Sequence, residues 1–132
     1  MTKKIKSPRK DNLIDKSKIV NGIGYPVFCF KHLRLIKWDN VQLKDFIERL
    51  QKLQQLGWNE INKSHRHSFG YEKIPIEAII PELPDFVTPD VNFLFAFRYT
   101  GDNRPFLAMR NGDILHVIFI EANFGDIYDH GK

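Results

Sequence analysis

The stretch FLFAFRYTGDNRPFLAMRNGDILHVIFI, from Phe93 to Ile120, decides the fold of this 132-residue chain. Within it, Asn111-Gly112 stands between two apolar runs, and this dipeptide favours a two-residue hairpin loop with a type I′ turn. A second turn, at Thr100-Gly-Asp-Asn103, follows an aromatic-rich run that is typical of a strand. The stretch therefore predicts a three-stranded antiparallel meander.

The Asn111-Gly112 turn also sets the expected register of the meander. Counting back from it pairs Met109 with Ile114, Leu107 with His116 and Pro105 with Ile118, while the earlier turn sets Phe97 opposite Phe106. One face then carries Phe93, Phe95, Phe97, Tyr99, Arg104, Phe106, Ala108, Arg110, Leu115, Val117 and Phe119. The other carries Leu94, Ala96, Arg98, Leu107, Met109, Ile114, His116, Ile118 and Ile120. On this second face we expect Arg98 and His116 to approach each other.

Both faces are apolar in their middles, so each needs a cover. Asp39 is a good N-cap with Gln42 three residues later, and Gly57 is a good helix end, so residues 41–56 are predicted to be a helix. Its apolar positions recur at steps of three and four residues: Leu43, Phe46, Ile47, Leu50, Leu53 and Leu56. The helix can cover one face. The N-terminal strands, the proline-rich segment, a partner chain or a ligand would cover the other.

Shorter elements are expected around this helix. Residues 25–31 are predicted to form a first strand, and Trp58 with Ile61 suggests a further helical turn. Residues 70–89 contain four prolines and are predicted to be an ordered connection with one helical turn at 76–80. The predicted class is therefore α+β, an antiparallel sheet whose C-terminal three-stranded meander packs on one main amphipathic helix.

Composition predicts one domain over residues 21–132, preceded by a basic flexible tail over residues 1–20. Residues 1–18 hold seven basic and two acidic residues, a net charge of +5, while the remainder holds 13 and 14, a net charge of −1. Such a tail is more typical of a solvated arm than of a nucleic-acid clamp. The chain has one cysteine and lacks both a membrane-length apolar run and a secretory leader, so we expect a cytoplasmic protein.

A few polar residues are candidates for chemistry. His65-Arg66-His67 has a spacing that suits a metal site on a strand, but no third ligand accompanies it, so a surface loop is preferred and no metal or cofactor is predicted. Arg98, Arg104 and Arg110 suit phosphate binding, although arginines at strand ends often pair with nearby acids. His116 is either a packed core residue or an acid–base group. The phosphate-loop, nucleophile-elbow and zinc motifs are missing from the sequence.

The order of the C-terminal motifs resembles that of the RelE/HigB-type bacterial toxins. The residues that carry the resemblance are Phe97-Arg98-Tyr99, Arg104-Pro-Phe106, Asn111-Gly-Asp113 and Asp126-Ile-Tyr128. The resemblance implies an endoribonuclease that cuts messenger RNA on the ribosome and is paired with a small antitoxin protein. Arg98, Arg104 and Tyr128 would then hold the scissile phosphate, with His116 or the patch His65, Arg66 and His67 as acid or substrate contact, and Arg110 as a further substrate contact. The body of the chain is less basic than is usual in that family.

Two other interpretations stay open. The chain also resembles short uncharacterised bacterial proteins that end in an apolar strand, a turn and Tyr-X-His. The alternative to an enzyme is a non-catalytic interaction module or homodimer, in which an apolar sheet face docks another protein or an identical subunit.

Overall fold

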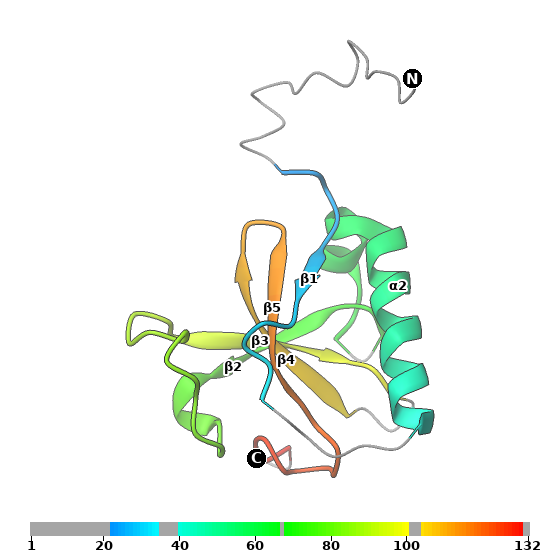
Figure 1. Cartoon of the computed structure of the whole chain (residues 1–132). Helices are drawn as coiled ribbons and strands as arrows, with labels where there is room; N and C mark the ends of the chain where they lie inside the picture. Colours follow the sequence, from blue (N-terminus) through cyan, green and yellow to red (C-terminus); the bar gives the residue numbers. More distant parts are fainter. Residues whose placement is uncertain (1–21, 35–39, 67, 101–103, 131–132) are drawn as a thin grey trace, which may run out of the picture.

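In the computed structural model, residues 22–34, 40–66, 68–100 and 104–130 are described. Their strands form one sheet in the order β1-β5-β4-β3-β2, with one long helix, α2 (Asn40–Lys63), against one face (Figure 1). The strands are β1 (Val27–Cys29), β2 (Tyr71–Pro75), β3 (Phe93–Arg98), β4 (Pro105–Asn111) and β5 (Ile114–Ile120). The predicted α+β class and the meander β3-β4-β5 are confirmed. The sheet is mixed, because β1 runs parallel to β5 while the other neighbours are antiparallel.

The register predicted for the last hairpin is wrong, because its two-residue loop lies one residue later in the chain than predicted. Asn111 pairs with Ile114, so the loop is Gly112-Asp113, with Gly112 at a φ of 63°. Asp113 is held in the loop by the β1 segment, because its carbonyl accepts a hydrogen bond from Val27 N at 2.9 Å. The pairing of Phe97 with Phe106 is confirmed.

A β-bulge between Leu107 and Ala108 changes the two faces at the end of β5. Ala108 pairs with Val117 and Leu107 with Phe119, so Ile118 is the extra residue of the bulge. Phe119 therefore packs in the core under the second face and Ile120 in the core under the helix, the reverse of the prediction. An alternation rule cannot anticipate this exchange, because one added residue inverts every later side chain.

The predicted end of the main helix is confirmed as a break at Gly57, with a second helical part up to Lys63. Gly57 has a φ of 80°, and a Cβ there would lie 3.0 Å from the carbonyl oxygen of Gly24. That oxygen accepts a hydrogen bond from Trp58 N at 2.8 Å, which brings the chain before β1 against the break. Phe46, Leu50, Leu53, Trp58 and Ile61 pack on the sheet. Leu43 and Ile47, predicted on the same face, are 42% and 45% exposed. Asp39 lies outside the described residues.

The proline-rich segment covers the second face of the sheet, as one of the four predicted alternatives proposes. Its apolar residues, followed by Val91, join a second core with the C-terminal Ile127 and Tyr128: Ile74, Ile76, Ile79, Leu83, Phe86 and Val87. The expectation that this segment holds only a helical turn is wrong at its start, since residues 71–75 form the edge strand β2. The turn itself is the 3₁₀ helix η3 (Ile76–Ala78). The strand predicted over residues 25–31 is shorter, as β1.

Candidate functional site

A pocket of about 390 Å³ lies at the edge of the second face, where β2 and the end of β3 meet the C-terminal segment. Its polar lining comes from four parts of the chain: Arg66, Glu72, Lys73, Arg98, Tyr128, Asp129 and His130. The size falls within the usual range for small-molecule sites, roughly 300–1,000 Å³. The pocket therefore brings titratable groups of distant sequence positions to one place.

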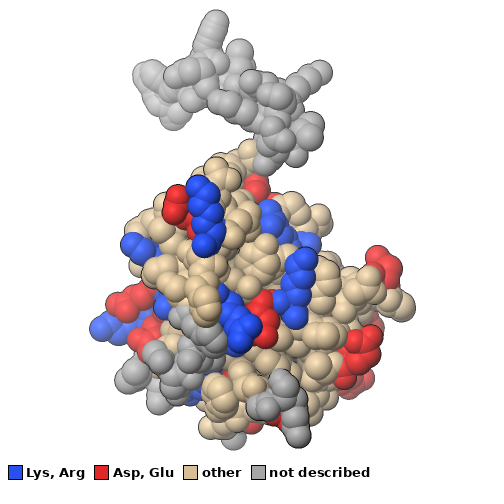
Figure 2. Space-filling model, turned by 180° about the vertical axis from the view of Figure 1, so that it is seen from behind, with Lys and Arg blue, Asp and Glu red and all other residues tan. Residues whose placement is uncertain are grey.

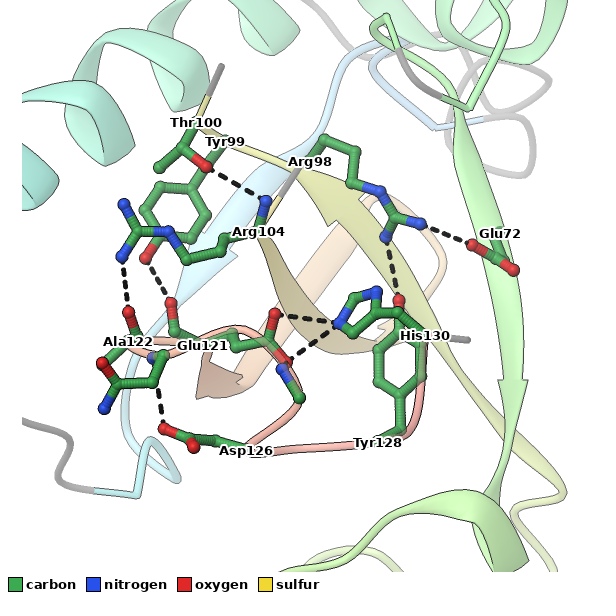
Figure 3. Close-up of polar contacts among 12 residues, drawn as sticks. Glu72, Arg98, Tyr99, Thr100, Arg104, Glu121, Ala122, Asp126, Tyr128 and His130 are labelled. Carbon is green, nitrogen blue, oxygen red and sulfur yellow. Dashed lines mark hydrogen bonds and ion pairs between the residues drawn. The ribbon is translucent and has the colours of Figure 1, made fainter. Parts of the chain in front are cut away.

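Arg98 stands at the centre of this group. It ends β3 on the second face, is only 5% exposed, and donates from Nη1 to the Tyr128 hydroxyl at 2.9 Å (Figure 3). Its Nη2 donates to Glu72 Oε1 at 2.8 Å, across from the edge strand β2. Arg98 Nε is buried and has no hydrogen-bond partner among the described residues. The buried guanidinium is thus held by one carboxylate and one hydroxyl, while its Nε–H makes no hydrogen bond to the described residues.

Behind the pocket, His130 pairs with a carboxylate that is fully buried. Glu121 directly follows β5, and both of its carboxylate oxygens lie near His130 Nε2, at 2.9 and 3.0 Å (Figure 3). Gly125 N donates to the same carboxylate at 3.0 Å. Because an ionised carboxylate only accepts hydrogen bonds, this contact places a proton on Nε2 and leaves Nδ1 as the acceptor of the neutral ring. The pair has the form of a carboxylate-oriented acid–base histidine.

The backbone around Glu121 is fixed from the helix side. The Tyr99 hydroxyl donates to Glu121 O, and the Arg104 guanidinium donates to Ala122 O (Figure 3). The Gln42 amide also donates to Ala122 O, at 3.0 Å. Glu121 N also donates to Pro105 O at 3.0 Å, which extends the β4–β5 ladder by one residue. Arg104 therefore positions the segment that carries the pocket and does not line the pocket itself.

Tyr128 is suited to donate a proton rather than to accept one. Burial raises the pKa of Tyr128, while the nearby Arg98 charge lowers it and does not cancel the effect of burial. The phenol therefore stays protonated at neutral pH. The Arg98 contact uses an acceptor lone pair of the hydroxyl, so its own proton remains available to another acceptor.

The other predicted site residues lie elsewhere. His116 pairs with Met109, not with Leu107, and is packed against His32 and Phe86, so the expected approach of Arg98 and His116 is wrong. Arg110 lies 3.6 Å from the centre of the Trp58 ring, on the helix side. His65 is exposed in a turn, as predicted for that loop, and His67 lies outside the described residues. Of the predicted residues, Arg66, Arg98 and Tyr128 share the pocket.

His116 gives the fold a dependence on pH. Its buried Nδ1 has no hydrogen-bond partner among the described residues, and burial together with the charge of His32 lowers the pKa of His116. As the pH falls, the unfolded chain, with a histidine pKa of about 6.5, binds the proton first. The stability that neutral His116 contributes is therefore present above about pH 6.5 and is lost below it.

We expect His116→Leu to flatten the fall in unfolding free energy between about pH 7 and pH 5, because the variant has no proton to bind at this position. Urea unfolding at several pH values measures it. His65→Ala, at an exposed position, is the matched control and should keep the wild-type slope. An unchanged slope in His116→Leu would contradict the assignment.

Nowhere in the described residues do three or more His, Cys, Asp or Glu side chains gather in a way that would hold a metal ion. None of their helices has the length and apolar character needed to cross a membrane.

Comparison with known proteins adds no relative. This chain matches no protein-family model, no curated protein and no solved structure.

Sequence reasoning missed the most buried part of the site. The sequence suggests a turn followed by a short strand over residues 123–130, with Tyr128 and His130 as candidate exposed polar groups, but Tyr128 is buried and residues 121–130 contain no strand. Glu121 is not among the predicted site residues. Its signal is an acid placed directly after seven mostly apolar strand residues, where a charge needs a buried partner.

Proposed function

We propose that this protein is an endoribonuclease similar in activity to the RelE/HigB-type toxins. The observation that carries the proposal is the shared pocket of Arg98, Tyr128 and His130, with His130 held by the buried Glu121. Cleavage of RNA through its own 2′-hydroxyl requires a base, a cation for the phosphorane and a proton donor for the leaving oxygen. These three residues supply one group of each kind.

In the proposed reaction His130 is the general base. Its Nδ1 takes the proton of the 2′-hydroxyl as the 2′-oxygen forms a bond to phosphorus, and Glu121 stabilises the imidazolium that results. The bond from phosphorus to the 5′-oxygen breaks, and that oxygen takes the Tyr128 proton. Arg98, 2.9 Å from the phenol oxygen, stabilises the phenolate and the negative charge of the phosphorane. A 2′,3′-cyclic phosphate and a 5′-hydroxyl are the products.

The remaining parts of the proposal concern partners. RNA, alone or on the ribosome, is the substrate, a small antitoxin protein is the expected inhibitor, and the site of action is the cytoplasm. Figure 2 shows Lys and Arg side chains interspersed with Asp and Glu on one face of the body, so a broad basic surface is not what would attract RNA there. The N-terminal residues 1–18, with a net charge of +5, would add that attraction.

Growth and cleavage assays test the proposal together. We expect induced wild-type protein to arrest bacterial growth and to release cyclic-phosphate ends from RNA in vitro, because the pocket supplies base, cation and acid. His130→Asn, Arg98→Ala and Tyr128→Phe should each relieve arrest and slow cleavage by roughly 10²- to 10⁴-fold.

The matched control is Arg110→Ala, which removes an arginine that lies over Trp58 outside the pocket. It should retain arrest and cleavage if it folds, as circular dichroism would establish for every variant. A wild type that neither arrests growth nor cuts RNA would leave the proposal without support.

A second candidate function is the interaction module, and one observation favours it. Val27 and Ile114 are register partners on β1 and β5, and both are exposed apolar side chains. A wild type that is harmless to growth, yet self-associates or captures a partner through this edge, would support the module over the enzyme.

A further inference from the structure

We infer that Phe124 is a stacking platform for an unpaired nucleobase, so that the pocket takes single-stranded RNA and excludes the duplex. This inference rests on the proposed function and names the form of its substrate. It is carried by the exposure of one aromatic ring at the pocket, the rigidity of the turn that presents it, and the charges around it.

Phe124 is a large apolar side chain that the fold keeps in contact with solvent. It lines the pocket and is 56% exposed. The turn that carries it is closed by Asp126 N donating to Asn123 O at 3.0 Å and by Asn123 N donating to the Asp126 carboxylate at 3.1 Å. Gly125, next in the chain, is tied to the buried Glu121 at 3.0 Å. Phe124 is therefore fixed at the surface by the same carboxylate that orients His130.

The ring of Phe124 continues a series of aromatic rings. The centres of the Tyr128 and His130 rings are 4.2 Å apart, and those of His130 and Phe124 are 4.0 Å apart, with interplanar angles of 30° and 26°. Phe124 is the exposed member of this series. A base placed on its free surface would extend the stack and would bring the attached ribose and phosphate beside His130 and Arg98.

The arginines of the pocket suit the phosphates of a nucleic-acid strand. Arg66 and Arg98 line it together with two carboxylates, Glu72 and Asp129. The ammonium of Lys73 lies 4.8 Å from the centre of the Phe93 ring, on the helix side of the sheet. Stacking on an aromatic ring combined with cations along the backbone is the usual way in which proteins hold single strands. In a duplex both faces of each base are already stacked on neighbours, so a paired base cannot use the ring without being unstacked. A peptide would use the ring but would bring no phosphates to the two guanidinium groups.

Binding of an uncleavable strand tests the inference apart from catalysis. The probe is a fluorescein-labelled 2′-O-methyl RNA of about ten nucleotides, used single-stranded, as a duplex, and as a set of strands that each lack one base. Fluorescence anisotropy measures the dissociation constant with wild type, Phe124→Ala and Phe124→Trp. Ile80→Ala is the matched control, because it removes an exposed apolar side chain outside the pocket.

We expect Phe124→Ala to bind the single strand roughly 5- to 150-fold more weakly, the loss of one stacked base. Phe124→Trp and Ile80→Ala should bind as the wild type does, and the duplex should bind more weakly than the single strand. Removing the base that stacks should weaken wild type and leave Phe124→Ala unchanged, which a general loss of structure cannot reproduce.

Equal binding of the strand by wild type and Phe124→Ala overturns the inference, as does a duplex that binds as well as the single strand or a wild type that binds neither. Capture of a peptide through Phe124 by a protein that does not bind RNA overturns it as well. Normal RNA cleavage together with an indifferent Phe124→Ala would leave the proposed function standing. Strand binding that depends on Phe124, in a protein that never cleaves RNA, would support the inference and contradict the enzyme.

Discussion

Phe106→Ala is expected to lower the free energy of unfolding by about 3–5 kcal/mol, a large part of the ~5–15 kcal/mol that holds a small domain folded. Phe106 is fully buried on β4, and its ring meets aromatic rings from three other elements. It stacks on Phe97 at 5.3 Å, and Phe46 and Phe28 approach it edge-on at 5.3 and 6.3 Å. Removing the ring leaves a cavity where β1, α2 and β3 converge.

Urea unfolding of Phe106→Ala measures this cost, with an unchanged slope showing that the folded state is otherwise preserved. Phe124→Ala is the matched control, because it removes the same side chain from an exposed position and should cost no more than about 1.5 kcal/mol, including the lost stacking on His130. A Phe106→Ala cost below about 1 kcal/mol would mean that the aromatic cluster is not the centre of the core.

His130→Ala is expected to cost about 3–5 kcal/mol, because it leaves the Glu121 carboxylate buried without its imidazole. Glu121→Ala removes the charge itself and leaves His130, which lines the pocket, to be solvated from there. The double variant should therefore cost less than the sum of the two single ones, with a coupling of roughly 0.5–3 kcal/mol. Urea unfolding of all four proteins measures the coupling at neutral pH.

An exposed ion pair provides the control for this cycle. Lys44 and Glu48 lie 4.0 Å apart on α2 with side chains 74% and 62% exposed, so their coupling should stay near 0.3–0.5 kcal/mol. Equal coupling in the two pairs would show that Glu121 is solvated in solution and is not the buried anchor of His130. This result would weaken the assignment of His130 as base without any measurement of cleavage.

Some residues of the candidate site can be predicted from the sequence, but the contacts between them cannot. Arg98 is a candidate from the sequence because a charged group among aliphatic residues needs a reason, and Tyr128 is one because it matches the closing tyrosine of the RelE/HigB resemblance. Their hydrogen bond joins residues 30 positions apart and depends on how the C-terminal segment folds back over the second face. The predicted approach of His116 to Arg98 depends on a loop at Asn111-Gly112. The loop at Gly112-Asp113 gives a different register, in which His116 pairs with Met109. Glu121 and His130 become partners only through the turn between them.

What the sequence determined by itself is local. The Phe93 to Ile120 stretch specifies three strands, and the period of the residues before Gly57 specifies a helix, because alternation and helical spacing act over a few neighbours. Which turn residues form the loop, where the bulge falls, and that β1 joins β5 in parallel depend on contacts between distant segments. The tertiary structure alone decided that the proline-rich segment and the C-terminal residues close over one face. That closure builds the pocket, because burying Arg98 and Glu121 forces each to take the partners that surround it.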